Sequence, residues 1–503
     1  MTNTSTLDIE ASAAQCLRIA QAGADLVRLT AQGVRHAKAL SEIRRLVRQH
    51  GSDIPLVADI HFNPDAAFAA AEEVEKVRIN PGNFVDPGRT FKQLTYTDEE
   101  YAAEIERIRA KLVPFLELCR ANGTAIRLGV NHGSLSDRIM SRYGDTPRGM
   151  VESVIEFLEI CRSVNFMDVV ISIKASNVVV MTQTVRMLAD EMARRGMDFP
   201  LHLGVTEAGD GDDGRIKSAV GIGSLLVDGL GDTIRVSLSE EPEAELPVAR
   251  MLRDYINTLA KAPALESDAP HTHVYGQRRP SRRIGDFGAD ATTLVIGHDI
   301  AADDVPDGVK TLIAEGPHRI NQIRRAFDIM DAGGDDSPAI VELHYPATMS
   351  PEEVTIAASV DLGALLLEGY GADGVHLIAE SLGDARCSTL ALDILQATRR
   401  RISKTEYIAC PGCGRTLFGL PEVLGRVRQA TSHLKGLKIG VMGCIVNGPG
   451  EMADADYGYV GAAAGKISLY KGKECIEKNI PADEAVPRLI ELIKAGGDWT
   501  DPE

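Results

Sequence analysis

The chain has 503 residues, and 54 Lys and Arg against 72 Asp and Glu give it a formal net charge of −18 at pH 7. A hydrophobic content of 44% and a charged content of 25% exclude wholesale disorder, and the acidic balance argues against a nucleic-acid or anionic-membrane binder. The absence of a long apolar run and of a secretory signal predicts a soluble cytoplasmic protein of roughly two to four domains.

The first 255 or so residues repeat one pattern, in which a short apolar strand is followed by an amphipathic helix. Strands are expected at residues 24–30, 56–61, 76–80, 125–131, 169–176, 201–207 and 233–238. Such alternation predicts parallel strands with helical crossovers, and we expect an α/β fold with a (β/α)8 TIM-type barrel over residues 1–261. Only seven strands can be counted. Either the sheet is open and doubly wound, or the first strand is missing because the chain starts late; we favour the second interpretation, which leaves an unpaired seam.

Two further segments follow the expected barrel. Residues 262–291 are rich in Pro, Gly and charge and resemble a linker, and they open a weaker α/β pattern that extends to residue 403. Strands are expected there at 292–297, 310–315, 339–345 and 374–380, with helices at 320–332 and 387–401. Residues 404–503 combine strands and turns with a closing helix at 481–496, which predicts an α+β domain.

The spacing of three cysteines is the most informative feature of the chain. Cys410 and Cys413 form a C-x-x-C turn, and Cys444 follows after 30 intervening residues. Thiolates at this spacing select zinc or an iron–sulfur cluster. Three cysteines leave one metal position for another ligand, and Glu451, in the turn sequence NGPGE, is the nearest carboxylate by sequence.

A structural zinc site is the alternative to a cluster, with His433 or Cys475 as its fourth ligand. The spacing alone leaves both alternatives open. The remaining cysteines lie on apolar, helix-like faces and are expected in the core: Cys16, Cys119, Cys161 and Cys387.

Cations recur near the carboxyl ends of the expected barrel strands, where barrel active sites form. They are Arg28, Arg78, Arg127, Lys174 and Arg235. Each buried cation needs an anionic partner. Asp59 and Glu207 could neutralise some of them internally, but five cations outnumber two carboxylates, which favours a polyanionic substrate such as a diphosphate.

Other polar residues share the same expected rim. Neutral hydrogen bonds to the substrate are expected from Asn80, Asn83, Asn131, Ser176 and Ser237. Asp59 and His61 end one strand, and His202, Thr206 and Glu207 end another. Glu207 is the candidate general acid, because a carboxyl group in a closing pocket can have a raised pKa. Gly221 and Gly223 would permit a phosphate loop, although short glycine patterns are common.

The sequence motifs that contain these residues resemble those of a known enzyme family. The motifs MTNT, GADLVR, LVADIHF, VRINPGN, IRLGVN, IKAS, LHLGVTEAG, GIG, GDTIRVSL, ACPGCGR and GCIVNGPGE occur in the order typical of the 4-hydroxy-3-methylbut-2-enyl diphosphate synthases, the IspG or GcpE family. The match spans residues 1–255 and 405–465, and the segment between them resembles the inserted domain of three-domain members. The resemblance implies that this inserted domain is barrel-like and chiefly structural. Family members begin upstream with a strand that the present chain lacks.

The resemblance also implies an activity. The substrate would be 2-C-methyl-D-erythritol 2,4-cyclodiphosphate, opened and dehydrated by two electrons in the non-mevalonate isoprenoid pathway. Cys410, Cys413, Cys444 and Glu451 would hold a [4Fe–4S] cluster, and Glu207 would deliver a proton. The five cations would grip the diphosphate, with Asp59, His61, Asn131 and His202 lining the pocket.

Ferredoxin or flavodoxin would then supply the electrons. A domain must swing to bring the cluster over the barrel. The inserted domain would be the spacer that lets one chain close on itself, whereas two-domain relatives are thought to use a partner subunit in a homodimer. Two other functions remain in competition: a non-redox barrel enzyme resembling pterin-binding synthases with a zinc module, and a non-enzymatic iron–sulfur carrier.

Overall fold

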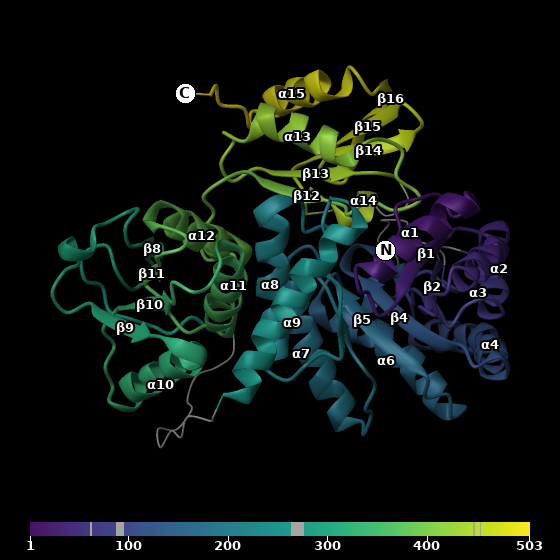
Figure 1. The fold of residues 1–503 in the computed structure, drawn as a ribbon, viewed down its shortest axis with the longest axis horizontal. Coiled ribbons are helices and arrows are strands. Elements are labelled where there is room, and N and C mark those ends of the chain that lie inside the picture. Colours follow the sequence, from purple (N-terminus) through teal and green to yellow (C-terminus); the bar gives the residue numbers. More distant parts are fainter. Residues whose placement is uncertain (61–62, 87–94, 263–275, 446–447, 453, 503) are drawn as a thin grey trace.

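The structure is a computed structural model, and it describes residues 1–60, 63–86, 95–262, 276–445, 448–452 and 454–502 (Figure 1). Within the α14 helix, the side chains of Pro449 and Glu451 are also outside the described part.

Parallel strands form the first part of the chain. Before residue 262 the described residues contain seven strands: β1 (Val27–Ala31), β2 (Leu56–Ile60), β3 (Lys76–Ile79), β4 (Ala125–Asn131), β5 (Val169–Lys174), β6 (His202–Leu203) and β7 (Thr233–Ile234). Strands β1 to β5 pair in sequential order, a bridge between Ile171 and Leu201 joins β5 to β6, and β6 pairs with β7. A doubly wound sheet would reverse its order at a switch point, so sequential pairing supports a TIM-barrel-like sheet over the doubly wound alternative.

The start of the chain lies against this sheet. In the described residues no strand precedes α1, and the Thr2 N–H donates to the Arg28 carbonyl at 3.0 Å. The expected shortfall of one strand is therefore confirmed for the part of the chain that is described.

Helices connect the strands and cover the outside of the barrel. They are α1 (Ile9–Gln21), α2 (Val34–Gln49), α3 (Pro64–Ala71), α4 (Asp98–Asn122), α5 (Asp137–Tyr143), α6 (Pro147–Ser163), α7 (Val178–Arg194), α8 (Gly211–Val227) and α9 (Glu245–Lys261). Their ends follow local chemistry. For example, α4 begins with a capping box between Thr97 and Glu100 and ends at Gly123, whose φ of 66° suits a residue without Cβ. We call the region from α1 to α9 the barrel.

The middle segment, β8 to α12, has its own sheet. Its strands are β8 (Leu294–Val295), β9 (Lys310–Ala314), β10 (Ala339–Tyr345) and β11 (Gly374–Ala379), and its helices are α10 (Arg319–Ala332), α11 (Pro351–Glu368) and α12 (Asp384–Ala397). All four expected strands are confirmed, and they pair in parallel in the order β8-β11-β10-β9. The barrel-like form expected for this segment is not what its described residues build, because four strands leave β8 and β9 as open edges.

Small residues hold the middle segment against the barrel. Helices α8 and α11 pack so closely that a Cβ at Gly223 would lie 2.5 Å from Val360, and a Cβ at Gly363 would lie 3.0 Å from Val220. Gly221 and Gly223 therefore serve helix packing inside α8, and the phosphate loop that they would permit does not form.

The C-terminal segment, β12 to α15, is a mixed sheet with helices. It comprises β12 (Glu406–Ala409), α13 (Leu420–Thr431), β13 (Lys438–Met442), α14 (Gly448–Glu451), β14 (Tyr457–Ala463), β15 (Lys466–Lys471), β16 (Glu474–Pro481) and α15 (Ala485–Gly496). Strands β12 to β14 are parallel, and β15 and β16 continue the sheet antiparallel. The expected closing helix is confirmed as α15.

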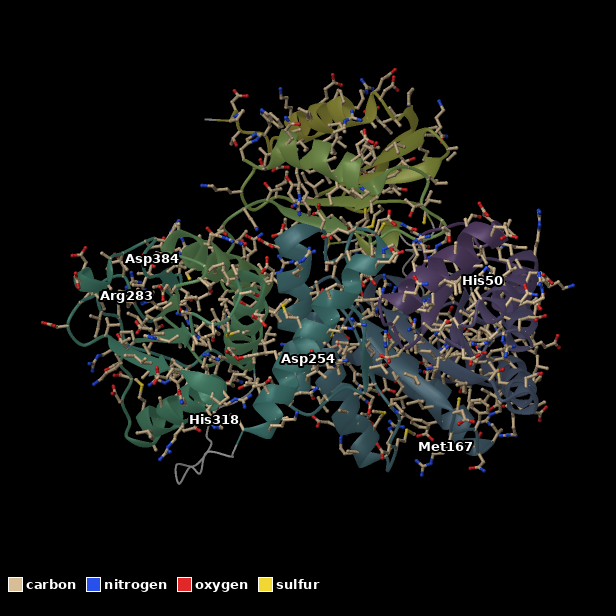
Figure 2. All side chains as sticks on the ribbon, viewed as in Figure 1. His50, Met167, Asp254, Arg283, His318 and Asp384 are labelled. Carbon is tan, nitrogen blue, oxygen red and sulfur yellow. The ribbon has the colours of Figure 1, made fainter. Side chains whose placement is uncertain are left out.

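The three parts meet around α8. The C-terminal segment lies over one end of the barrel, and the middle segment lies beside α8 and α9 (Figure 1). Labelled side chains such as His50, Met167 and Arg283 lie on the outer surface, away from the seam between the barrel and the C-terminal segment (Figure 2). None of the described helices has the length and apolar character needed to cross a membrane.

Candidate active site

A cavity lies between the carboxyl ends of the barrel strands and the C-terminal segment. It encloses about 760 Å³ of empty space, part of which is open to solvent. The barrel contributes Met1, Arg28, Asp59, Arg78, Arg127, Asn131, Ser172, Lys174, Thr206, Glu207, Arg235 and Ser237. The C-terminal segment contributes Cys410, Pro411, Gly412, Cys413, Arg415, Thr416, Met442, Gly443, Cys444 and Gly448.

Backbone contacts fix the C-terminal segment on the barrel rim. Ala208 forms a parallel β-bridge with Ala409, and the Ser239 hydroxyl donates to the carbonyl of Cys410 at 2.8 Å. Two glycines permit close approach: a Cβ at Gly414 would lie 2.4 Å from the Thr4 carbonyl oxygen, and one at Gly450 would lie 2.4 Å from that of Gly133. One chain therefore closes both halves of the cavity by itself.

Ion pairs reinforce this contact beside the cavity. Lys404, just before β12, pairs with Asp213 of α8 at 2.6 Å, and Arg428 of α13 pairs with the same carboxylate at 2.9 Å. Lys217 of α8 lies 3.6 Å from Glu406 of β12. Because the pairs share partners and are partly buried, they act as a network that favours the closed arrangement.

Strand register brings the predicted cations together. Asp59, Arg78 and Arg127 occupy directly adjacent positions on β2, β3 and β4, and Asn131 of β4 is adjacent to Lys174 of β5. Asp59 accepts a hydrogen bond from Arg78 at 3.1 Å and lies 4.0 Å from Arg28. One carboxylate is thus shared by at least two guanidinium groups.

Carboxylates of the chain neutralise some of the predicted cations but not all of them. Arg235 makes two hydrogen bonds, at 2.7 and 3.0 Å, to Glu245 at the start of α9. Arg127 and Lys174, both buried, have no carboxylate partner among the described residues. Burial, followed by repulsion from neighbouring arginines, lowers the pKa of both groups well below its ordinary value. The surplus of positive charge predicted from the sequence therefore persists in the described part of the folded chain. A bound anion would relieve the repulsion between these cations.

Several predicted polar residues lie elsewhere. Asn80 does not line the cavity: its amide donates to the Ser134 hydroxyl at 2.8 Å, and its oxygen accepts from the Gly82 N–H. Ser176 lines a small neighbouring pocket with Asn131 and Thr206. His61 lies outside the described residues.

His202 lies below the cavity lining. Its Nδ1 is 2.9 Å from the Thr233 hydroxyl, and burial with the charges of Arg127 and Lys174 lowers its pKa well below the ordinary value. The ring is therefore neutral at pH 7.

Glu207 is buried and has an unusual backbone conformation. Its φ of 49° is in the left-handed region, which costs a residue other than glycine about 1–3 kcal/mol. The Ala208–Ala409 bridge follows immediately and fixes this conformation against Cys410. Strain of this kind is typical of functional sites.

All three predicted cysteines line the cavity. The Gly443 N–H donates to Cys410 Sγ at 3.3 Å, and Arg415 Nε donates to Cys413 Sγ at 3.3 Å. Desolvation raises the pKa of Cys410 despite that bond, and a bound cation such as a metal would favour its thiolate form. Sulfur donors with N–H groups aimed at them fit an iron–sulfur cluster. The side chain of Glu451 lies outside the described part.

The structure does not bring either of the expected fourth zinc ligands to the three cysteines. His433 contacts the Thr500 carbonyl, and Cys475 of β16 contacts that of Glu477, so neither lines the cavity.

Sequence reasoning missed several lining residues. Ser172 precedes Lys174 by two positions, and the alternation of a strand could have indicated that both face the cavity. Arg415 stands in the cysteine motif itself. Glu245 does not line the cavity but holds Arg235 from a helix, and no local signal in the sequence points to it.

Comparison with known proteins finds two family models in the chain. The "GcpE TIM-barrel domain" matches residues 1–250, and the "GcpE protein C-terminal domain" matches residues 406–495.

Curated relatives match the whole chain. The chain is 51% identical to the "4-hydroxy-3-methylbut-2-en-1-yl diphosphate synthase (flavodoxin)" of Bacteroides fragilis, over 100% of this chain and 93% of the relative. It is 47% identical to the protein of the same name from Porphyromonas gingivalis, over 100% and 94%. It is 38% identical to the "4-hydroxy-3-methylbut-2-en-1-yl diphosphate synthase (ferredoxin), chloroplastic" of Oryza sativa, over 100% and 85%.

Proposed function

The chain belongs to the GcpE family of 4-hydroxy-3-methylbut-2-en-1-yl diphosphate synthases, and on that premise we propose how its residues carry out the family's reaction. The enzyme is an oxidoreductase of isoprenoid biosynthesis. It opens 2-C-methyl-D-erythritol 2,4-cyclodiphosphate and dehydrates it, with two electrons, to (E)-4-hydroxy-3-methylbut-2-enyl diphosphate. The observation that supports this proposal best is the single cavity that strand-end cations and three cysteines line together.

The cofactor of the family is an iron–sulfur cluster, and the proposed form is [4Fe–4S]. Cys410, Cys413 and Cys444 would hold three of its irons, with Glu451 as the fourth protein ligand. When bound, the cluster supplies electrons and a Lewis-acidic iron. The chain's own contribution is to direct the Gly443 N–H and Arg415 at the sulfurs.

The barrel would bind the diphosphate of the substrate. Arg127 and Lys174 carry the uncompensated charge, so they would contact phosphate oxygens directly. Arg28, Arg78 and Arg235 share carboxylates and would contribute the outer part of the same grip. The remaining proposed contacts are His61 and four residues that line the cavity, Asp59, Asn131, Thr206 and Ser237. Asn80, Ser176 and His202, which were also expected to bind the substrate, do not line this cavity.

Glu207 would hold and deliver the proton that the leaving hydroxyl group needs. It faces the cavity beside Cys410, in a backbone conformation that the docked C-terminal segment maintains. Closure of that segment would exclude water from the reacting substrate.

The domain arrangement that we propose is a substrate-binding barrel at 1–261, a spacer at 262–403 and a cluster domain at 404–503. The electron donor would be a flavodoxin or a ferredoxin, as in the names of the relatives. The intrachain cavity argues for a site that one chain completes, without a homodimer partner.

Anaerobic reconstitution tests this proposal. The purified chain should bind about four irons and four sulfides, turn brown, and convert the cyclic diphosphate when a chemical reductant or reduced flavodoxin is supplied. Cys444→Ser should lose both the colour and the turnover. A colourless chain with stoichiometric zinc, or Cys444→Ser with full turnover, would contradict it.

A further inference from the structure

Arg415 is a buried cation that the C-terminal segment adds to the cavity. It follows Cys413 by two residues, and its side chain is 9% exposed, as is typical of a core residue. One edge of its guanidinium is occupied, because Nε donates to Cys413 Sγ at 3.3 Å. Such a bond stabilises the thiolate form of the cysteine.

The other edge of the guanidinium is available. Its Nη1 is buried and has no hydrogen-bond partner among the described residues. A guanidinium is always charged in proteins, so Arg415 is a buried cation. It lines the same cavity as Asp59, the carboxylate that Arg28 and Arg78 share.

The position of Arg415 depends on closure. The residue before it, Gly414, is so close to the barrel that a Cβ would lie 2.4 Å from the Thr4 carbonyl oxygen and 2.9 Å from the Thr30 hydroxyl. Thr30 is adjacent to Asp59 in the strand register. Docking of this backbone on β1 thus delivers the guanidinium to the anion site, and withdrawal of the C-terminal segment would remove it.

We propose that Arg415 couples substrate binding to the redox centre, with one edge on Cys413 and the other on the substrate's diphosphate. This inference rests on the proposed function. The substrate would complete the unfilled hydrogen bonds of a buried arginine only when the chain is closed, so binding and closure favour each other. Phosphate contact would also withdraw positive charge from the thiolate, and the reduction potential would respond to the substrate.

Two variants test the coupling. Arg415→Gln should raise KM by about 10- to 100-fold, the loss expected for a hydrogen bond to a charged group. In the substrate-free holoenzyme, an EPR-monitored redox titration should give a more negative potential, because an N–H donor and a positive charge leave the sulfur. Adding inorganic diphosphate should shift the potential of the wild type but not that of the variant.

Arg415→Lys keeps the charge but cannot donate from two edges, so it should recover part of KM without restoring the diphosphate-dependent shift. If Arg415→Gln does not bind iron, the KM of Arg415→Lys and its diphosphate-dependent shift in potential test the inference by themselves. Arg426→Gln, which removes an exposed cation from α13 of the same segment, is the control and should match the wild type.

Unchanged KM and potential in Arg415→Gln, or a diphosphate shift of wild-type size in both variants, would overturn the inference. Such a result would leave the proposed function intact as long as the wild type converts the cyclic diphosphate. Failure of the wild type to convert it would refute the proposed function instead.

Discussion

Ala208 and Ala409 form a parallel β-bridge that joins the barrel rim to the C-terminal segment. Glu207 precedes one partner and Cys410 follows the other, so two residues about 200 positions apart in sequence lie at one wall of the cavity. Backbone contacts thus stabilise the closed arrangement. Its stability can be altered by substitutions that change neither Glu207 nor Cys410.

Gly450 offers such an alteration. A Cβ there would lie 2.4 Å from the Gly133 carbonyl oxygen, which is backbone and cannot rotate away, so Gly450→Ala should keep the segments apart. We expect at least a tenfold loss of kcat/KM with little change in iron content, and a larger radius of gyration by small-angle scattering. Gly425→Ala, at a position with no atom within 4 Å of the added methyl, is the control. Equal activity of the two variants would show that close approach at Gly450 is unnecessary.

The uncompensated cations predict a stabilising effect of inorganic diphosphate on the cluster-free chain. An anion that binds only the folded state stabilises it by about 2.7 kcal/mol at 100 times its Kd, so the unfolding midpoint should rise with concentration. Arg127→Gln should remove most of this rise, whereas Arg35→Gln, on the exposed face of α2, should retain it. Differential scanning calorimetry provides the measurement. A rise that persists in Arg127→Gln would place the anion elsewhere.

Glu207 should matter for turnover and not for binding. Glu207→Gln keeps the shape of the side chain but cannot deliver a proton, and general acid catalysis contributes about 100- to 10,000-fold. We expect a kcat loss in that range, with unchanged iron content and an unchanged diphosphate-dependent unfolding midpoint. Glu241→Gln, exposed on the same side of the barrel, should be active. A turnover within threefold of the wild type would remove Glu207 from the chemistry.

The barrel and its cations could be predicted because their signals are local. Apolar alternation located the strands, and β4 has the predicted bounds, Ala125–Asn131. Residue type alone marked Arg127 and Lys174 as candidates. Register could not be predicted, so nothing in the sequence showed that Asp59, Arg78 and Arg127 would be direct neighbours.

Other features depend on tertiary packing. Helix α11 was not expected because residues 354–368 are buried all round, which erases the amphipathic period. Gly221 and Gly223 suggested a phosphate loop because glycine for close helix packing and glycine for a turn are indistinguishable in sequence. The ladders of β6 and β7 each cover two residues, shorter than expected, because pairing ends where the chain turns into the rim.

The intrachain cavity predicts the result of mixing two inactive variants. Arg127→Gln disables the barrel and Cys410→Ser disables the cluster site, and each chain then carries one intact half of the cavity. Because one chain forms both halves, mixing them should recover no more than a few per cent of the activity. The two variants should be mixed as purified apo chains and then reconstituted together, so that assembly is not prevented. Substantial recovery would mean that a partner subunit completes the site.

Asp361 makes the contact between the barrel and the middle segment sensitive to pH. This fully buried carboxylate of α11 accepts hydrogen bonds from Tyr255 of α9 at 2.6 Å and from Tyr345 of β10 at 3.0 Å, and it lies 3.6 Å from Arg319. Burial raises its pKa to about 6 from 3.8, although Arg319 opposes the shift. Between these two values the folded chain retains a proton that the unfolded chain has lost, so the stabilisation is complete below about pH 3.8 and is lost as the pH rises through 6.

A shift of this size corresponds to about 3 kcal/mol of unfolding free energy over the whole interval. The unfolding midpoint of the wild type should therefore fall between pH 4 and pH 6.5 more steeply than that of Asp361→Asn, which has no proton to lose. Asp254→Asn, an exposed position on α9 (Figure 2), should keep the wild-type slope. Parallel slopes for Asp361→Asn and the wild type would show that Asp361 is ionised in the folded chain throughout this range, and that the interface depends on its packing alone.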